Sequence, residues 1–369
     1  MEPEKKKPDS IQKIFKRIFI YVLIFVLLIG ITFFLVFKDQ DLGEALRVYN
    51  NARFGFVALG IILMFGYFAI EAWNIYSILK SFGEKINYWQ AYKFTLIGFF
   101  FCSVTPGASG GQPLEIYYMS KEKISTAHAT LALLIQICGI QISVLFLGII
   151  GLLVSLGRME ASIIWWTLIG LVINGVALAA LLIGIFSKKI TKKFVDFFIY
   201  ILKFFNYKKI EKKQESINKS LEQYSEGAKY IKTHQKEFWI CIARSFAQMS
   251  IYFIIPFCVY KALSLSGTGF LSLFFLQAVL FMATSGLPLP GAIGASEAAF
   301  LSLYGLAFGE EMLGGAVLLN RSISFYWFVF ITMFVVFVNI IKLRAAKDKN
   351  SEETKWFCTA SGTVRPIVT

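Results

Sequence analysis

Five ionisable side chains lie within or beside long apolar stretches of this 369-residue chain: Glu71, Glu115, Glu297, Arg244 and Arg321. Charged groups at membrane depth are costly, so they usually face the interior of a helix bundle, where they are paired or functional. Two hypotheses stay open for them. Static pairs such as Glu297 with Arg321 neutralise one another, or an arginine contacts a phosphate while a glutamate binds a cationic group or a proton.

Two of the glutamates follow similar segments rich in proline and glycine. Thr105–Glu115 reads TPGASGGQPLE, and Leu289–Glu297 reads LPGAIGASE. Both contain Pro-Gly-Ala-x-Gly and then reach the glutamate, and both have apolar flanks. Proline and glycine break helices, so each segment is predicted to be a loop between two short helices.

Backbone that leaves a helix at membrane depth is tolerated only inside protein or beside a watery cavity. Ser296 is a candidate N-cap for the helix after the second loop. Two helix N-termini facing a shared cavity would bind an anionic group such as a lipid phosphate. The alternative is a pair of tight turns with an acid in the first helical turn. The candidate substrate-binding residues are Pro106, Gly107, Gly110, Gly111, Gln112, Glu115, Pro290, Gly291, Gly294, Glu297, Arg244 and Arg321.

The composition indicates that these loops belong to an all-α polytopic membrane protein. The chain is 57% hydrophobic and 16% charged, whereas soluble domains are about 25% charged. Full spans are predicted from uninterrupted apolar runs. They cover residues 18–37, 54–79, 127–155, 162–186, 238–262 and 312–341.

The stretches around the two loops are too short to span. Trp89–Val104 would be about 24 Å long as a helix, against a hydrocarbon core of about 30 Å. It is followed by the first loop and a short helix at Pro113–Met119. Gly269–Gly286 and Glu297–Phe308 flank the second loop in the same way. The pattern predicts two re-entrant helical hairpins.

The distribution of basic residues tests this topology. With a cytoplasmic N-terminus and two re-entrant hairpins, thirty Lys and Arg lie on the cytoplasmic side and five outside, as the positive-inside rule requires. Both termini are then cytoplasmic, and the hairpins enter from opposite sides, which indicates an inverted repeat. Letting both hairpins cross fully gives eight spans and the same sidedness, so charge does not separate these versions.

Three polar regions flank or interrupt the membrane domain at 18–342. Residues 1–17 form a basic cytoplasmic N-terminus, and 343–369 form a polar C-terminal tail. Between two spans, 187–237 carries thirteen lysines. Apolar residues at 194, 197, 198, 201, 202 and 205 predict an amphipathic helix there. It would lie on the anionic cytoplasmic leaflet or pack on the underside of the protein.

Cofactor chemistry is not expected. The five cysteines form no CxxC motif, and the two histidines have no carboxylate pattern around them, so we predict no metal site. No nucleotide-binding loop is present, so any transport is not driven by ATP through this chain alone. The net charge of +14 fits basic cytoplasmic loops beside anionic lipid, and no direct nucleic-acid partner is expected.

The paired motifs, with Tyr117 and Tyr118 after the first, resemble the transmembrane domain of the lysylphosphatidylglycerol synthase/flippase family, the multiple peptide resistance factor. The resemblance covers about residues 15–342. Family members often carry Glu where this chain has Gln112. Full-length members add a cytosolic domain that transfers lysine from charged tRNA to phosphatidylglycerol. This chain ends about 28 residues after its last predicted span, so we expect no such domain in it.

The resemblance implies a phospholipid flippase of the bacterial plasma membrane. It would move anionic or aminoacylated phosphatidylglycerol between leaflets and so set envelope charge and resistance to cationic peptides. One alternative is a phosphatidylglycerol lysyltransferase, or the membrane subunit of a split one that works with a separate synthase. A further alternative is an envelope scaffold. The sequence leaves a homo-oligomer open.

Overall fold

A computed structural model describes the chain over residues 30, 42–105, 108–159, 161–186, 229, 232, 235–287 and 289–341. Within these ranges every regular element is a helix, which confirms the predicted all-α class. The predicted first span at 18–37 except residue 30, both chain termini and most of the basic segment 187–237 lie outside the described residues.

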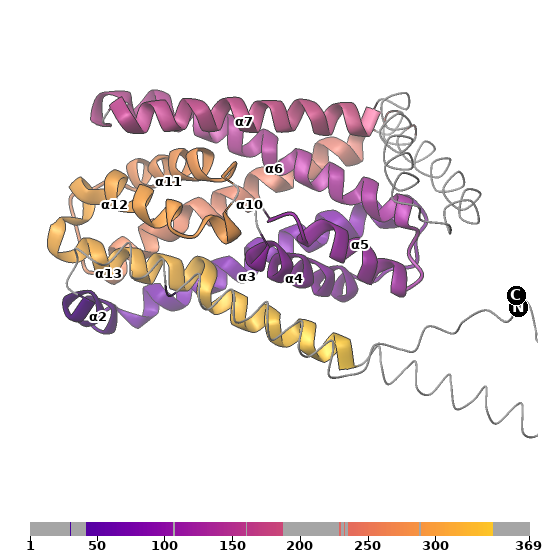
Figure 1. The fold of residues 1–369 in the computed structure, drawn as a ribbon, viewed down its shortest axis with the longest axis horizontal. Helices are drawn as coiled ribbons and strands as arrows, with labels where there is room; N and C mark the ends of the chain where they lie inside the picture. The colour runs from indigo at the N-terminus through magenta and orange to yellow at the C-terminus, as the bar shows by residue number, and fades with distance from the viewer. Residues whose placement is uncertain are drawn as a thin grey trace, which may run out of the picture.

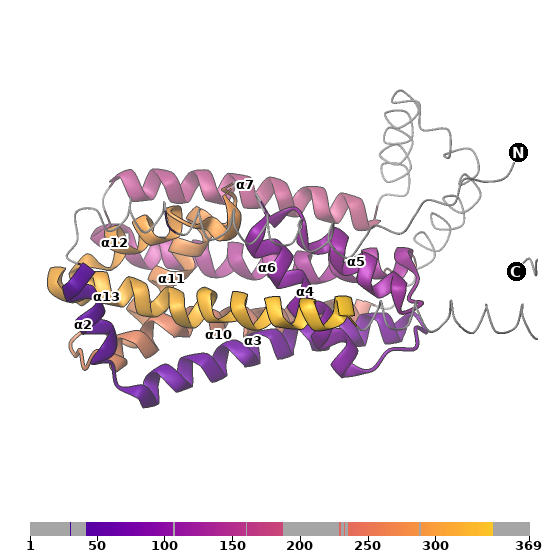
Figure 2. The same ribbon diagram turned by 60° about the horizontal axis from the view of Figure 1, so that its bottom comes forward.

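Five long apolar helices lie side by side along one axis (Figures 1 and 2). The last of them is a continuous run from Glu310 to Ile341 that contains one π-helical turn. Their ends agree with five of the six predicted spans to within about three residues. They are α3 (Phe54–Ser81), α6 (Thr126–Ser155), α7 (Ala161–Phe186), α10 (Gln235–Ala262), and α13 (Glu310–Arg321) continued through η5 (Ser322–Tyr326).

Four shorter helices form the two predicted hairpins. The first hairpin is α4 (Tyr88–Val104) and α5 (Gly111–Lys121), and the second is α11 (Phe270–Thr284) and α12 (Ala295–Phe308). At 1.5 Å per residue these helices are about 16–26 Å long, shorter than the hydrocarbon core. Figure 1 shows α4 and α5 at one end of the bundle and α11 and α12 at the other. The hairpins are therefore re-entrant and opposed.

The order of elements repeats along the chain. The sequence long, short, short, long occurs as α3, α4, α5, α6 and again as α10, α11, α12, α13. In both halves each helix packs against the next one. Because the two hairpins enter from opposite ends, this order is the one that an inverted repeat produces.

Local sequence determines where the first hairpin begins and breaks. Asn87 and Gln90 form a capping box at the start of α4, with two hydrogen bonds of 2.9 Å between side chains and backbone N–H groups. At the other end, Thr105 precedes Pro106. Proline disfavours helical backbone angles at the residue before it. Thr105 is extended, with φ −112° and ψ 142°, so α4 ends at Val104.

The tips of the two hairpins meet in the middle of the bundle. A short 3₁₀ turn, η4 (Pro290–Ala292), forms the tip of the second hairpin and packs against α4. Ile293 belongs to the same buried apolar cluster as Phe100 of α4. The rings of Phe99 on α4 and Phe325 on the π-helical turn are 6.1 Å apart. Packing at the tips therefore brings the two halves of the chain together at mid-depth.

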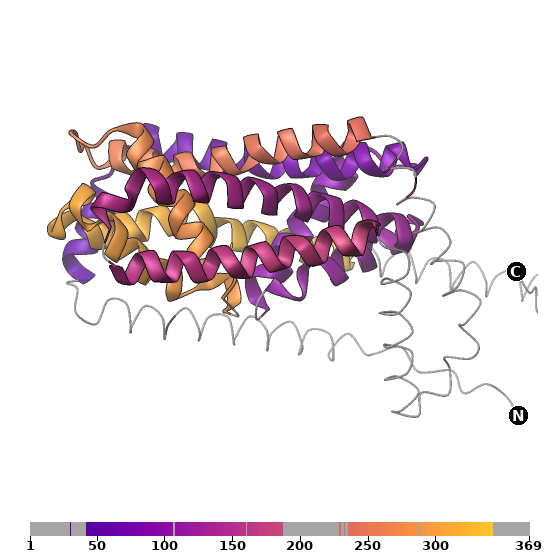
Figure 3. The ribbon, with the colours of Figure 1, turned by 90° about the horizontal axis from the view of Figure 1, so that it is seen from above.

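The outer surface is apolar along the helices. Figure 3 views the bundle from the side on which α7 lies. Large side chains on α7, including Trp165, Val172 and Val176, are about two-thirds exposed, as expected for a face in contact with lipid. One element was missed by the sequence analysis: α2 (Leu42–Asn50), a short helix that packs against α13.

Candidate functional site

The tip of the second hairpin depends on two glycines in left-handed backbone conformations. Gly291 has φ 56° and Gly294 has φ 87°. Residues other than glycine rarely adopt such positive φ angles. A Cβ atom at Gly291 would lie 2.3 Å from Cζ of Phe325. The predicted N-cap was wrong: Gly294 caps α12, and Ser296 lies inside its first turn. The Ser296 hydroxyl instead donates to the Ala292 carbonyl over 3.0 Å.

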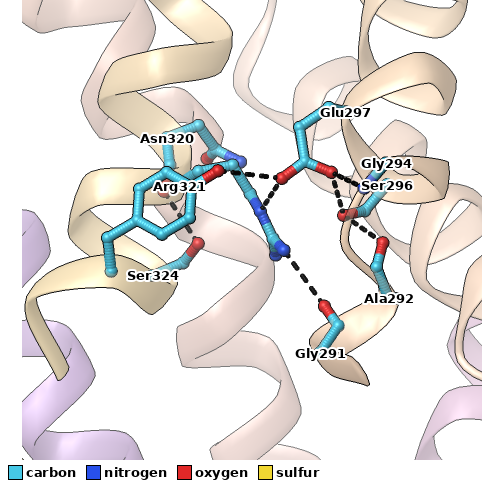
Figure 4. Close-up of polar contacts among 9 residues, drawn as sticks. Gly291, Ala292, Gly294, Ser296, Glu297, Asn320, Arg321 and Ser324 are labelled. Atoms are coloured by element: carbon cyan, nitrogen blue, oxygen red, sulfur yellow. Dashed lines mark hydrogen bonds and ion pairs between the residues drawn. The ribbon is translucent and has the colours of Figure 1, made fainter. Parts of the chain in front are cut away.

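Glu297 is the centre of a buried polar network (Figure 4). Its Oε2 accepts a hydrogen bond from the Gly294 N–H at 2.7 Å and lies 3.1 Å from the Ser296 hydroxyl, whose single proton is shared between this oxygen and the Ala292 carbonyl. Its Oε1 accepts from Nε of Arg321 at 2.7 Å and from the Tyr326 hydroxyl at 3.1 Å. Both carboxylate oxygens are therefore satisfied by the loop, by α13 and by the π-helical turn.

Arg321 links the hairpin tip to the long C-terminal helix. Its Nη2 donates to the Gly291 carbonyl over 3.0 Å, so the side chain binds both the loop backbone and Glu297 (Figure 4). Its guanidinium lies 4.5 Å from the centroid of the Phe325 ring, a cation–π distance. Only 8% of the Arg321 side chain and 2% of the Glu297 side chain are exposed. The structure therefore forms the Glu297–Arg321 ion pair that the sequence analysis named.

Glycines at the first hairpin permit close helix packing rather than unusual backbone angles. A Cβ at Gly111 would lie 2.0 Å from Sγ of Cys102 and 2.9 Å from the Gly98 carbonyl oxygen. A Cβ at Gly110 would lie 2.5 Å from Cγ2 of Thr105, whose hydroxyl accepts the Gly110 N–H at 2.9 Å. The N-terminus of α5 can therefore lie directly on α4.

Glu115 points to the interior of the first hairpin and differs from Glu297 in its partners. It is 4% exposed, and among the described residues its Oε1 has no hydrogen-bond partner. Its carboxylate lies against Gly98 of α4, where a Cβ would come within 2.6 Å of Oε2. The salt bridges formed by the described residues do not include Glu115. The two loop glutamates are therefore chemically unequal.

The remaining candidates of the two loops are less informative. Pro106 and Gly107 lie outside the described residues. Gln112 is half-buried, and its amide is 3.9 Å from Sγ of Cys102. Pro290 is the first residue of η4. Helix α5 begins at Gly111, so Pro113 is its third residue and not its first as predicted. Proline is tolerated there because the first turn needs no N–H partner.

Arg244 is separate from the Glu297–Arg321 pair. Its Nη1 donates to the Ser77 hydroxyl of α3 over 3.0 Å, and its guanidinium lies 5.1 Å from the Trp73 ring centroid. The structure therefore places one candidate arginine at the second hairpin tip and the other on the face between α3 and α10.

A buried hydrogen-bond chain joins three helices near mid-depth. The Gln248 amide on α10 donates to Glu71 on α3 at 2.9 Å, and its oxygen accepts from Gln136 on α6 at 3.0 Å. The sequence analysis named Glu71 as an ionisable residue of an apolar stretch but did not connect it to either glutamine. The signal in the sequence was that each of the three polar residues lies within a long apolar run, which is typical of a buried polar group.

A pocket of about 710 Å³ lies away from the hairpin tips. It lies between α2 and the adjoining ends of α10 and α13, at the end of the bundle where the second hairpin enters (Figure 1). Glu44 and Arg47 of α2 line it. No three His, Cys, Asp or Glu side chains of the described residues come together as metal ligands.

Comparison with known proteins identifies the family. A family profile described as the lysylphosphatidylglycerol synthase TM region matches residues 18–332. The chain belongs to this family. The matched range includes both hairpins, Glu71, Glu115 and the Glu297–Arg321 pair, so the sites described above are part of the family's membrane region. The resemblance noted from the paired Pro-Gly motifs is confirmed.

One curated relative is an archaeal protein. It is described as a UPF0104 membrane protein of Archaeoglobus fulgidus. It is 21% identical over 323 residues, which cover 85% of this chain and 96% of the relative. Together with the five long apolar helices, this similarity supports a multi-pass membrane protein.

Proposed function

We propose that this protein moves a phospholipid between the two leaflets of its membrane. One observation carries the proposal: two half-membrane hairpins enter from opposite ends, meet at mid-depth and hold buried charged side chains there. In transporters built from inverted repeats, substrates bind near the midplane at half-helix termini. The membership in a family named after a phospholipid synthase makes a phospholipid the substrate class that fits best.

Arg321 is the proposed contact for the lipid phosphate. A guanidinium has five N–H donors, and two of them are used in the hydrogen bonds to Glu297 and Gly291. Arginine binds phosphate oxygens with paired hydrogen bonds, as it binds carboxylates. The three remaining donors can bind a phosphate that enters beside the tip. Its negative charge would then compete with the Glu297 carboxylate for Arg321.

This competition supplies a mechanism for opening the tip. In the closed arrangement Glu297 holds the Gly294 N–H, Ser296, Arg321 and Tyr326 together. When a phosphate takes over Arg321, Glu297 is left to the loop alone, and the contact between α12 and α13 weakens. Glu297 then returns to Arg321 when the lipid leaves, which closes the site.

The substrate and orientation follow from charge. The proposed substrate is an anionic or aminoacylated phosphatidylglycerol, whose phosphate would meet Arg321. The end of the bundle where α4 begins is the proposed cytoplasmic end. Helix α7 ends there at Phe186 and α10 begins there at Gln235 (Figure 1), and the lysine-rich segment of the sequence follows the one and precedes the other, as the positive-inside rule favours for a cytoplasmic segment. In a bacterial plasma membrane, delivery of aminoacylated lipid to the outer leaflet would make the outer surface less negative. Cationic peptides would then be attracted to it less strongly.

A second candidate function is a membrane subunit for lysyl-lipid synthesis. The family description, which names a lysylphosphatidylglycerol synthase, favours it. Such a subunit would work with a separate synthase. Formation of lysylphosphatidylglycerol from lysyl-tRNA by the purified chain, or by the chain with that synthase, would be the supporting result.

Reconstitution into liposomes tests the transport proposal. The purified protein is placed in vesicles with head-group-labelled phosphatidylglycerol or its lysyl derivative, and the labelled lipid that reaches the outer leaflet is measured over time. We expect faster movement than in empty vesicles. Arg321→Lys keeps the charge but loses the planar paired donors, so we expect movement about tenfold slower, the equivalent of one lost paired contact.

Arg53→Lys is the matched control, because Arg53 is exposed at the start of α3. The same substitution there leaves the rate unchanged if the effect at Arg321 is specific. Absence of movement for both lipids in vesicles that contain folded protein would contradict the proposal. Equal rates for Arg321→Lys and the wild type would remove Arg321 from the mechanism.

A further inference from the structure

The two hairpins carry glutamates in comparable positions but with different charge balance. Each glutamate lies near the start of the second helix of its hairpin, Glu297 on α12 and Glu115 on α5. Glu297 is balanced by Arg321 at 2.7 Å. Glu115 is 4% exposed, and its Oε1 has no hydrogen-bond partner among the described residues. A symmetric structural role for the two residues does not explain this difference.

The surroundings of Glu115 are polar but acidic or neutral. The carboxylate lies against Gly98 of α4, and one helical turn earlier Thr95 has a buried hydroxyl that also lacks a partner among the described residues. The neighbouring titratable side chains are Glu71 of α3 and the Cys102 thiol of α4, and neither is a cation. None of these neighbours carries a positive charge that would balance the negative charge of an ionised Glu115.

The basic groups on the neighbouring elements have other partners. Lys93 of α4 forms a salt bridge with Glu122. His128 of α6 is 2.6 Å from Glu84, and the other titratable side chain of α6 is the buried Cys138. Two further cations bind aromatic rings: Lys121 of α5 lies over Tyr117, and Arg244 of α10 lies over Trp73. Each of these cations has a partner other than Glu115.

Glu71 connects this region to the far side of the bundle. It accepts a hydrogen bond from Gln248, which in turn accepts one from Gln136. Asn74, one turn along α3 from Glu71, also has a buried oxygen without a partner among the described residues. The Asn74 amide itself donates to the Cys241 carbonyl and the Ser245 hydroxyl of α10. Buried polar groups usually have hydrogen-bond partners, so the oxygens of Asn74, Thr95 and Glu115 that lack one among the described residues are exceptions.

A buried carboxylate without a cation costs several kcal/mol to desolvate, so such a group usually binds a proton or a cation. We propose that Glu115 is a proton-binding site, with Glu71 as the neighbouring carboxyl, and that proton binding and release there accompany lipid movement. The carboxylate takes a proton from water on one side of the membrane and returns it to water on the other. This inference rests on the transport function proposed above and supplies its energy source.

Infrared spectroscopy tests the proton site without any lipid movement. A protonated carboxyl group gives a C=O stretching band that a carboxylate lacks. We expect this band in the purified wild-type protein, its growth as the pH is lowered, and its loss in Glu115→Gln. Glu311→Gln, at an exposed acid of α13, is the matched control and keeps the band. The same band in Glu115→Gln and wild type would overturn the inference.

Labelling covers the case in which Glu115→Gln does not fold. Dicyclohexylcarbodiimide reacts with protonated carboxyl groups in apolar surroundings, and mass spectrometry locates the product in the wild-type chain. An adduct on Glu115 that forms faster at lower pH supports the proposal. Adducts on other carboxyls with none on Glu115 would contradict it. If Na⁺ at constant pH protected Glu115 from labelling, the site would bind a metal cation in place of a proton. That result would also overturn the proposal.

A pH gradient across the liposomes then tests coupling. With one proton per lipid, a gradient of one pH unit shifts the lipid distribution by up to about tenfold, and we expect Glu115→Gln to lose this shift. Lipid movement that ignores the gradient, together with no carboxyl band from Glu115, refutes the inference but leaves the transport function standing. A titrating Glu115 band without lipid movement refutes the transport function but leaves the proton site.

Discussion

The Nε atom of Arg321 donates a hydrogen bond of 2.7 Å to Oε1 of Glu297, a residue 24 positions earlier in the chain. This bond joins the tip of the second hairpin to the longest helix of the described chain. Both side chains are buried, so the pair is a charged contact between α12 and α13 inside the bundle, and under the transport proposal a ligand phosphate would have to break it. Glu115, on the first hairpin, has no such bond to any arginine or lysine of the described residues.

Removal of the negative partner should strongly destabilise the protein. Glu297→Gln leaves Arg321 buried without a counter-ion, which we expect to lower the free energy of unfolding by about 3–5 kcal/mol. Thermal unfolding in detergent, followed by tryptophan fluorescence, measures the effect. Glu311→Gln, the same change at an exposed acid, serves as the control. The double variant with Glu297→Gln and Arg321→Gln removes both charges, so its free energy of unfolding should fall less than that of Glu297→Gln. An equal melting temperature for Glu297→Gln and wild type would refute the prediction.

The second loop should not tolerate a side chain at Gly294. Gly294→Ala forces alanine into a backbone with φ 87°, which we expect to cost about 1–3 kcal/mol of stability. Gly305→Ala is a control on the same helix, since the closest atom to its new Cβ would be 4.0 Å away. Alanine favours helix over glycine by about 0.5–1 kcal/mol, so this control should be neutral or more stable. Parallel unfolding curves decide, and equal stability of both variants would argue against a strained tip.

The first hairpin should depend on close packing at Gly111. Its Cβ would lie 2.0 Å from Sγ of Cys102 and 2.9 Å from the Gly98 carbonyl oxygen, so Gly111→Ala must push α5 away from α4. We expect a loss of about 1–3 kcal/mol, typical of an overpacked core. Adding Cys102→Ala removes one of the two clashes and should restore part of the loss. Gly175→Ala on α7, which meets nothing within 4 Å, is the control. No recovery in the double variant would mean that Cys102 is not what limits the packing.

The hydrogen-bond chain through Gln248 should behave as one unit. Gln248→Leu leaves both Glu71 and Gln136 without this partner, whereas Gln136→Leu removes only one end of the chain. In a double-mutant cycle the two losses should not add, with a coupling of about 0.5–3 kcal/mol. Unfolding free energies of the wild type, the two single variants and the double variant provide the cycle. Additive losses would show that the two bonds are independent.

Much of the architecture could be predicted because it depends on local composition. Apolar runs of about 20 residues require membrane spans, and Pro106, Gly110, Pro290 and Gly294 mark the places where helices must break. The basic loops indicated that the hairpins are opposed. The short α2 was missed because nine residues of mixed polarity carry no long apolar run. Ser296 was a candidate N-cap because serine is a common cap, but the cap is Gly294, so the helix begins two residues earlier than that prediction places it.

The sequence by itself determined that this is a helical membrane protein with two broken hairpins and a few charges inside. Helix periodicity, proline and glycine conformation and the cost of charge in lipid are local or one-dimensional properties. Only the tertiary structure decided which charges meet. Arg321 lies beside Glu297 and not Glu115 because α12 packs against α13, while α5 packs against α4 and α6. Pairing between distant residues depends on that packing, which residue type and spacing do not specify.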